Sequence, residues 1–388
     1  MRIAKGLITI DELEYNNFNN RHSILLEYFN GVINVYKEIV KLPPYLLKAL
    51  FGDCPRNLNF DFHRALGNEL ITPPVFFRTD ESSPGRILEI QCPGSQWGEY
   101  QVVVDFLFEK NSEMLREYSL SDKFSEHLCR YLHAEEPVVH HLLDNSSIPH
   151  TMNYFIQKTR NKIKYFSLDK KIKQLDCNFI RSHSVYGLVA ENFFWHRVEQ
   201  GKKSKLFFDL PPFIPFDEKI SLSLPFNNDT KQFFSDNVRS ILAYTTPILT
   251  NEIQLENSEK INFENFSKMS RSTRNYYLKY AGSDVSINWG SRAVYRLSNC
   301  NSEDCLTYLT NALRDFTVFG RCWILQKEEK CYHEISWIKT DNSIITETLP
   351  TGFRGFYGPF GLLGIGALHR SHYKIHGQED TIFSIVSK

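Results

Sequence analysis

The chain has 388 residues, of which 42% are hydrophobic and 23% charged, and its 45 lysines and arginines balance 45 aspartates and glutamates. A chain of this length and composition can bury a large core and is expected to form two or three lobes. The formal net charge of +0 argues against a general nucleic-acid-binding surface. No apolar run in the sequence reaches the roughly 18 residues that a membrane span needs. We therefore expect a globular protein with no nucleic-acid partner and no membrane association.

The N-terminus and the cysteines indicate the compartment. The opening MRIAKGLITIDELEYNN becomes polar too early for a secretory signal peptide. The 8 cysteines are scattered, the closest pair being Cys300 and Cys305, and no CxxC or Cys/His metal-binding spacing occurs. Reduced, structural cysteines in a cytoplasmic protein are therefore expected. The sequence does not indicate an oligomeric state.

Hydrophobic periodicity predicts the elements of the first two thirds of the chain. Apolar residues at helical spacing predict a helix over 20–41, which KLPP at 41–44 ends. Residues 112–143 show a mostly helical pattern. The middle of the chain, 150–250, mixes strand, loop and helix patterns.

The last third of the chain is the richest in strand patterns. Strands are predicted at 276–281, 291–298 and 322–326, with a helix at 302–318 and a glycine-rich segment at 355–370. Together with the earlier elements, these segments predict an α+β fold. We expect three parts, comprising residues 1–110, 111–250 and 251–388.

The segment Pro74–Gln91, PVFFRTDESSPGRILEIQ, places two apolar runs on either side of a turn-like ESSPG. In a strand, residues two apart point to the same face. If the runs pair as a hairpin, one face carries four polar side chains: Arg78, Asp80, Glu89 and Gln91. Two carboxylates and an amide oxygen suit Mg²⁺, which shares its remaining coordination with water and phosphate. A surface hairpin with a solvated polar face explains the same alternation.

A second pattern lies at 276–298, YYLKYAGSDVSINWGSRAVYRLS. A predicted strand bearing Lys279 leads into a loop containing glycine and serine, and then into another strand. Such a loop lets backbone N–H groups approach a bound anion, and the lysine supplies charge for phosphate oxygens. The loop matches neither the Walker A nor the dinucleotide-binding motif. A phosphate-binding loop and a glycine-containing hairpin turn both remain open.

The segment CWILQK at 322–327 is an apolar strand that ends in the amide Gln326. An apolar wall beside a polar group suits a nucleotide base, although a buried core strand is the commoner explanation. The sequence has no GxSxG signature of a serine nucleophile and no HExxH zinc motif.

Taken together, these segments resemble the synthetase domain of glutathionylspermidine synthases and related circularly permuted ATP-grasp proteins. In that family an Arg-x-Asp strand pairs with a Glu-x-Asn strand. A lysine segment, a strand lysine with a phosphate loop, a hinge glutamine and a late arginine follow in order. The corresponding positions here look like Arg78-Thr79-Asp80, Glu89-Ile90-Gln91, Lys219, Lys279 with 281–291, Gln326 and Arg370.

The resemblance covers residues 75–388, without a counterpart for residues 1–70 and without a fused peptidase domain. Two positions differ from the family pattern. Gln91 stands where the family has asparagine, which lengthens the ligand by one methylene. The loop AGSDVSINWGS replaces the usual Gly-Arg-Glu-Gly type and so changes what contacts the phosphates.

The resemblance implies an ATP-grasp-like α+β fold with mixed and antiparallel sheets in circularly permuted order. It implies an ADP-forming ligase that uses ATP and Mg²⁺. ATP would phosphorylate a small-molecule or peptide carboxylate, and an amine would then displace phosphate to leave an amide. A kinase-type phosphotransferase and a non-catalytic nucleotide-binding protein on the same scaffold remain as alternatives.

The same resemblance implies roles for particular residues. The metal ligands would be Asp80, Glu89 and Gln91, and the catalytic residues would be Arg78, Lys279 and Arg370. The ATP-binding residues would be Lys219, Lys279, Gly282, Ser283, Gly290, Ser291 and Gln326.

Overall fold

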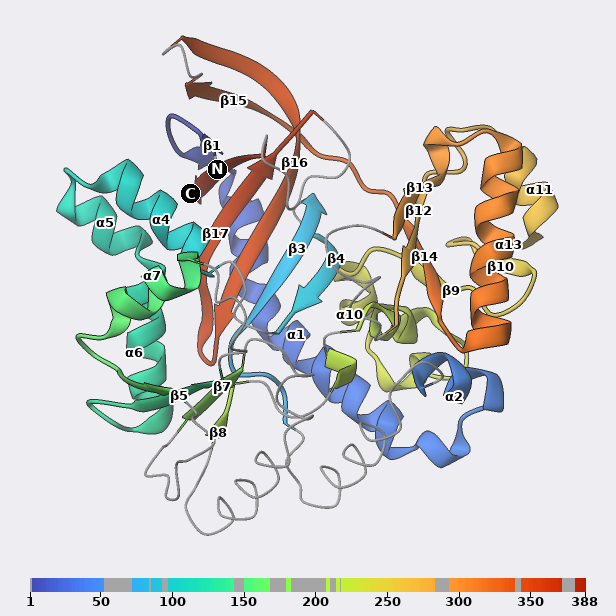
Figure 1. The fold of residues 1–388 in the computed structure, drawn as a ribbon, viewed down its shortest axis with the longest axis horizontal. Coiled ribbons are helices and arrows are strands. Elements are labelled where there is room, and N and C mark those ends of the chain that lie inside the picture. The colour runs from blue at the N-terminus through green and yellow to red at the C-terminus, as the bar shows by residue number, and fades with distance from the viewer. Residues whose placement is uncertain are drawn as a thin grey trace.

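The computed structural model describes residues 2–51, 72–83, 85–92, 97–142, 150–167, 179–182, 207–209, 214–216, 218–282, 293–338, 343–371 and 381–388. Within these residues the chain has a mixed α+β fold built around one large sheet (Figure 1). The predicted α+β class is confirmed at this level.

The large sheet has 8 strands among the described residues, in the order β1-β18-β17-β16-β3-β4, with β15 paired to β16 and β2 paired to β18. It is a mixed sheet, because β1 and β2 run parallel to β18 whereas its other pairs are antiparallel. The strands are β1 Arg2–Ile3, β2 Ile8–Thr9, β3 Phe77–Ser83, β4 Arg86–Gln91, β15 Tyr332–Ile338, β16 Ile344–Gly358, β17 Gly361–His369 and β18 Ile382–Ser387. The sheet thus joins the segments predicted as the separate parts 1–110 and 251–388.

Helix α1 (Glu12–Lys37) packs against one face of this sheet. It begins with a capping box in which the side chains of Asp11 and Glu14 each accept from the other residue's backbone N–H. The helix predicted over 20–41 is confirmed, but it starts earlier and ends at Lys37. A 3-10 turn, η1 (Ile39–Lys41), and helix α2 (Pro44–Phe51) follow.

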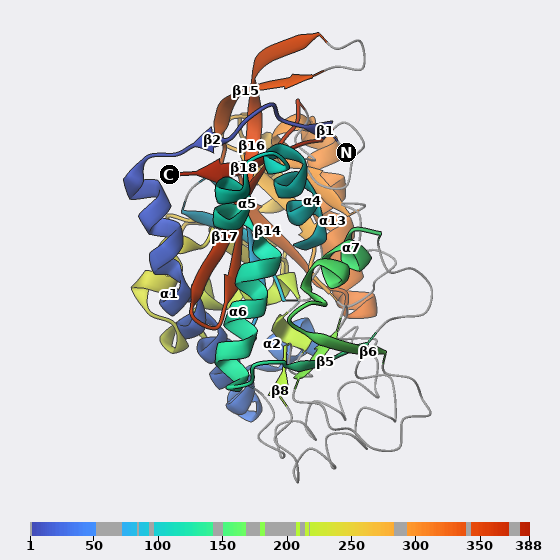
Figure 2. The same ribbon diagram turned by 90° about the vertical axis from the view of Figure 1, so that its left-hand side faces the viewer.

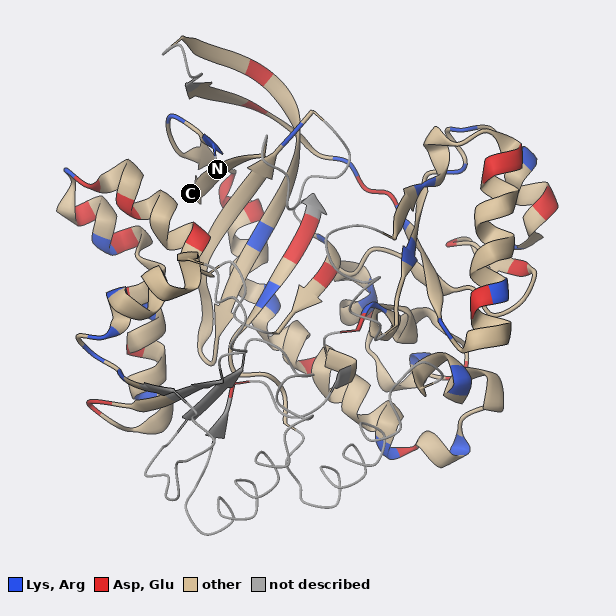
Figure 3. Ribbon diagram, in the orientation of Figure 1, with Lys and Arg blue, Asp and Glu red and all other residues tan. Residues whose placement is uncertain are grey.

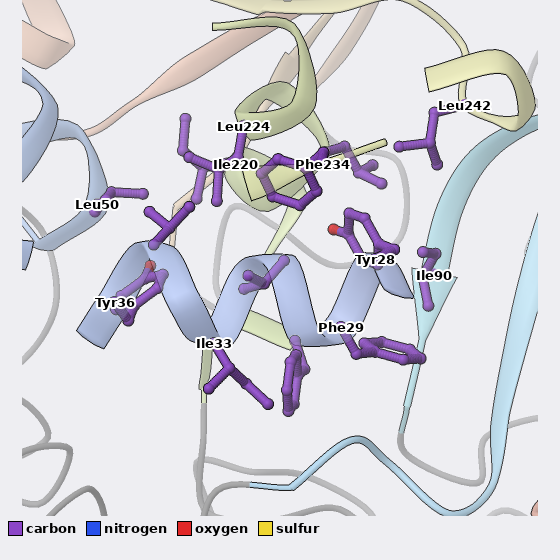
Figure 4. Packing of buried hydrophobic residues seen from close by; sticks show 14 of the residues in the cluster. Tyr28, Phe29, Ile33, Tyr36, Leu50, Ile90, Ile220, Leu224, Phe234 and Leu242 are labelled. Atoms are coloured by element: carbon purple, nitrogen blue, oxygen red, sulfur yellow. The ribbon is translucent and has the colours of Figure 1, made fainter. Parts of the chain in front are cut away.

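Apolar side chains of α1 pack on more than one side of the helix, as Figure 4 shows. Phe29 packs edge-to-face on Phe77 of β3, with ring centroids 5.0 Å apart. Further members of this cluster are Tyr28, Ile33, Tyr36, Ile90, Ile220, Leu224, Phe234 and Leu242. This packing holds the back of the β3–β4 hairpin against the helix.

Helices cover the opposite face of the large sheet (Figure 2). They are α4 Trp97–Phe108, α5 Ser112–Tyr118, α6 Leu120–Leu132 and α7 His150–Thr159. Trp97 and Tyr100 of α4 both pack edge-to-face on Phe356 of β16. The mostly helical pattern at 112–143 is confirmed except at its end, where a strand forms.

A second sheet, with the order β13-β12-β14-β9, is antiparallel throughout. Its strands are β9 Thr245–Pro247, β12 Tyr276–Tyr280, β13 Val294–Arg296 and β14 Trp323–Lys327, and helices α11 Phe263–Lys268 and α13 Ser302–Phe319 pack on it. The strands predicted at 276–281 and 322–326 and the helix predicted at 302–318 are therefore confirmed. Of the strand predicted at 291–298, the structure shows Val294–Arg296, because η6 begins at Leu297 and residues 291–292 lie outside the described ranges. Gly320 caps the C-terminus of α13, and its φ of 73° suits a residue without a Cβ.

Shorter elements precede this sheet and connect its parts. They are η2 Ile214–Phe216, η3 Lys219–Phe226, η4 Lys231–Phe233, α10 Asp236–Ile241, the strand pair β10 Glu252–Gln254 and β11 Lys260–Asn262, and η6 Leu297–Asn299. The backbone N–H of Ala243 donates to Ile87 O at 3.0 Å, so this region also borders β4.

A third sheet is parallel, with the order β6-β5-β7-β8. Its strands are β5 Val138–Leu142, β6 Lys164–Ser167, β7 Phe179–Ser182 and β8 Phe207–Phe208. Asp209, directly after β8, accepts backbone hydrogen bonds from Val75 (2.9 Å) and Phe76 (3.2 Å). These bonds fix the chain just before β3 begins.

None of the helices in the described ranges combines the length and apolar character of a membrane span. Within the same ranges the cysteines are thiols, including both members of the closest pair, Cys300 and Cys305.

Candidate functional site

The β3–β4 hairpin brings the four polar residues to one face, as the alternating pattern predicts, although the pairing shifts register next to Asp80 and Glu81. Arg78 lies opposite Gln91, and Asp80 lies opposite Glu89. Residues that pair directly across two strands share a face, so the four polar side chains are neighbours. Phe77 and other alternate residues are buried on the opposite face, against α1. The predicted hairpin is confirmed, and metal binding by its polar face stays a prediction.

Arg78 binds its neighbours on this polar face. Its Nε and Nη2 atoms donate to the two carboxylate oxygens of Asp80, each at 2.9 Å, and Nη2 also donates to Gln91 Oε1. The side chains of Arg78 and Asp80 are 1% and 4% exposed. A bidentate arginine–carboxylate pair buried in this way is strong and geometrically defined.

Strand β16 brings a second arginine that the sequence analysis did not identify. Arg354 lies opposite Asp80 on β16, and its Nε atom is 3.4 Å from Asp80 Oδ1. Its Nη1 atom lies 3.4 Å from Glu99 Oε2 on α4. Burial, and then the charge of Arg78, lower the pKa of Arg354 to about 10. Figure 3 shows basic and acidic segments next to one another on β16, β3 and β4.

The second sheet contributes Lys279 from β12 and Gln326 from β14. Lys279 Nζ donates to Gln326 Oε1 at 2.6 Å. The Gln326 amide in turn donates to Leu88 O of β4 at 3.0 Å and to Thr245 Oγ1 at 3.1 Å. Gln326 is completely buried and Lys279 is 9% exposed. Gln326 therefore links the second sheet to the hairpin by hydrogen bonds and positions Lys279 next to the hairpin.

Lys219, the first residue of η3, completes the group. Its Nζ atom is 3.2 Å from Glu89 Oε1, which also accepts from Gln91 Nε2 at 3.2 Å. Burial by itself would raise the pKa of Glu89, but the charges of Lys219 and Lys279 hold that pKa below its usual value. Burial lowers the pKa of Lys279 to about 8, although the nearby carboxylates Glu89 and Asp80 oppose this shift.

Other predicted site residues lie elsewhere or outside the described ranges. Arg370 directly follows β17, and its backbone N–H donates to Pro350 O at 3.3 Å. Strand β16 separates β17 from β3, so the structure places Arg354, rather than Arg370, beside Asp80. Gly282 follows Ala281 at the end of β12. The remaining loop positions, Ser283, Gly290 and Ser291, lie outside the described residues.

The donor set on the hairpin fits Mg²⁺ by its chemistry. Among the described residues, no group of three or more His, Cys, Asp or Glu could hold a metal ion. The predicted set has two carboxylates and the amide oxygen of Gln91, which is enough for an ion that keeps most of its ligands as water or phosphate. In the ligand-free protein, the Arg78 guanidinium donates hydrogen bonds to the oxygens of two of these predicted ligands, Asp80 and Gln91.

The site thus lies where the large sheet meets the second sheet. Three cationic side chains (Arg78, Lys219 and Arg354) lie within 4 Å of the carboxylates Asp80, Glu89 and Glu99, and Lys279 joins this cluster through its hydrogen bond to Gln326. Such a cluster can exchange its internal ion pairs for a polyanionic ligand and a counter-cation. A scan against models of known protein families finds no match, and a search of curated proteins finds no significantly similar sequence.

Proposed function

We propose that the protein is an ATP-dependent ligase that joins a carboxylate to an amine, on an ATP-grasp-like scaffold in circularly permuted order. The observation that carries the proposal is the convergence of the β3–β4 hairpin with Lys219, Lys279 and Gln326. These residues are far apart in the chain, and they are the positions at which the chain resembles the permuted ATP-grasp family.

The proposed reaction has two steps. A carboxylate oxygen of the acid substrate attacks the γ-phosphorus of ATP, which gives an acyl phosphate and releases ADP. The amine then attacks the acyl carbon, phosphate leaves with the electrons of the broken C–O bond, and the amine loses a proton. Mg²⁺ bound by Asp80, Glu89 and Gln91 would neutralise phosphate charge during this transfer.

The chain itself would act by position and charge. Lys279 and Lys219 would donate to phosphate oxygens, and Gln326 would border the base. The pKa of about 8 for Lys279 belongs to the ligand-free protein. A phosphate beside its Nζ atom would favour the charged form and raise that pKa. Arg78 would bind the carboxylate of the acid or the charge that develops on it.

One observation favours a second candidate, a nucleotide-binding protein without turnover. Arg78 already occupies hydrogen-bonding positions on Asp80 and Gln91, two of the predicted metal ligands. If these pairs never open, ATP can bind through the lysines without being activated.

An ADP-release screen tests both candidates. The protein is incubated with ATP, Mg²⁺ and pairs of amino acids, polyamines and peptides, and products are identified by mass spectrometry. The proposal predicts ADP release that requires both a carboxylate and an amine, together with an amide product. ADP release with a single substrate and a phosphorylated product would instead indicate a kinase.

Variants link the result to the site. Lys279→Met should abolish ADP release, whereas the matched control Lys268→Met, on the exposed side of α11, should leave it unchanged. A melting temperature that rises with ATP and Mg²⁺, without ADP release from any pair, would support the nucleotide-binding candidate. An unchanged melting temperature together with no ADP release would reject both.

A further inference from the structure

The Arg78 guanidinium interacts with the same oxygens that are expected to bind a metal. It donates to both carboxylate oxygens of Asp80 and to Gln91 Oε1. Asp80 and Gln91 are on adjacent strands, so a single guanidinium bridges them across the hairpin. Glu89, the third member of the set, is paired instead with Lys219 at 3.2 Å.

A guanidinium and a divalent cation compete for a carboxylate. The bidentate guanidinium uses one lone pair on each Asp80 oxygen, which leaves a metal only the second lone pair of each oxygen. Two positive charges within a few ångströms of one buried carboxylate also repel each other strongly. Metal binding at Asp80 and Gln91 therefore competes with the Arg78 hydrogen bonds, chiefly through charge repulsion.

Arg78 is the nearer of two competing arginines. Arg354 lies at 3.4 Å from Asp80 Oδ1, against 2.9 Å for Arg78, and it pairs with Glu99 as well. Arg354 can stay on Glu99 when a metal arrives, whereas Arg78 donates directly to the oxygens that are expected to bind the metal.

We propose that a divalent cation displaces the Arg78 guanidinium from Asp80 and Gln91, and that this displacement makes Arg78 available to bind the anionic group of the acid substrate. This inference rests on the proposed function, because it names the order of events at that site. The metal binds first, and the carboxylate then binds to the released arginine. Without metal, the site stays closed by its own ion pair.

The test measures metal binding in the absence of ATP, acid and amine. Mn²⁺ replaces Mg²⁺ because it accepts the same oxygen ligands and its free fraction is read by electron paramagnetic resonance. Arg78→Met keeps a side chain of similar length and removes the competing charge. We expect this variant to bind Mn²⁺ about tenfold or more tightly than the unaltered protein. Equal or weaker binding would overturn the proposal.

The matched control is Arg86→Met on the same hairpin. Arg86 is the first residue of β4, and its guanidinium donates a hydrogen bond to Ser240 O at the surface rather than to Asp80. This variant should bind Mn²⁺ as the unaltered protein does. A gain equal to that of Arg78→Met would show a general charge effect and would overturn the proposal.

A second measurement needs no variant and so does not depend on Arg78→Met folding. Phenylglyoxal labelling with peptide mapping compares Arg78 in the unaltered protein with and without Mg²⁺. Displacement predicts that Mg²⁺ raises the labelling of Arg78 and leaves that of Arg86 unchanged. Labelling of Arg78 that is insensitive to saturating Mg²⁺ would overturn the proposal.

The outcome is separable from that of the ligase proposal. ADP release that requires both substrates, together with Mn²⁺ affinity unchanged in Arg78→Met, would reject the displacement and keep the ligase. Tighter Mn²⁺ binding in Arg78→Met, with no ADP release from any substrate pair, would keep the displacement of Arg78 by metal and reject the ligase.

Discussion

The buried ammonium of Lys279 makes a quantitative prediction about stability. Burial lowers its pKa from 10.5 to about 8 in the folded protein. Between these values the unfolded chain binds a proton that the folded protein releases, so stability rises with pH across this window. At about 1.36 kcal/mol per pKa unit, the cost of burying the charge is ~3 kcal/mol at about pH 7. It falls by ~2 kcal/mol between about pH 7 and 9.5.

The variant Lys279→Met removes this titration. In this variant Gln326 Oε1 has lost the hydrogen bond from Lys279, which lowers the free energy of unfolding by ~1–3 kcal/mol. Because this loss is the same at every pH, it does not contribute to the difference between two pH values. We therefore expect urea denaturation to show that the original protein gains ~2 kcal/mol relative to Lys279→Met between about pH 7 and 9.5. The exposed control Lys268→Met should follow the original protein. Parallel pH profiles for Lys279→Met and the original protein would refute the reasoning.

Two further substitutions test the packing that supports the site. Arg21→Met removes the arginine that pairs with the buried carboxylate of Glu81. Urea denaturation should therefore show that the free energy of unfolding falls by ~3–5 kcal/mol. A decrease under ~1 kcal/mol would contradict the pairing. Gly98→Ala places a Cβ 1.7 Å from the backbone oxygen of Thr151, so α4 and α7 must separate and calorimetry should show a much lower melting temperature. Gly6→Ala, which meets nothing within 4 Å, should melt as the original protein does, and equal melting of the two variants would be inconsistent with the packing.

The hairpin could be predicted because its information is local. A period of two places Arg78 with Asp80 and Glu89 with Gln91, and a short turn limits how the strands can pair. The turn contains Gly85, whose φ of 111° other residues rarely adopt. The same local reasoning found the strand of Lys279 and the strand of Gln326, although it did not predict that their side chains bind each other.

Arg354 could not be predicted because its place depends on a distant pairing. Nothing in TGFRGFYG distinguishes this arginine from others in strands, and its role follows from the register of β16 on β3. The resemblance favoured Arg370 as the late arginine, but that residue lies past the end of β17. For a similar reason, the sequence did not show that helix α1 (residues 12–37) contacts the hairpin. Arg21 reaches the hairpin through Glu81, which lies on the face of β3 opposite Asp80.

The pairing pattern also explains how so much charge can be buried without a ligand. A buried charge is costly unless it is paired. Here Asp80 is paired with Arg78 and Glu89 with Lys219. Under the proposed function, a polyanion that arrives with a divalent cation would exchange these internal pairs for new ones, lysine to phosphate and carboxylate to metal, and the released Arg78 would then pair with the acid substrate. The net affinity for such a ligand would then be a difference between two paired states, so under the proposal a stronger Arg78–Asp80 pair in the free protein would weaken metal binding.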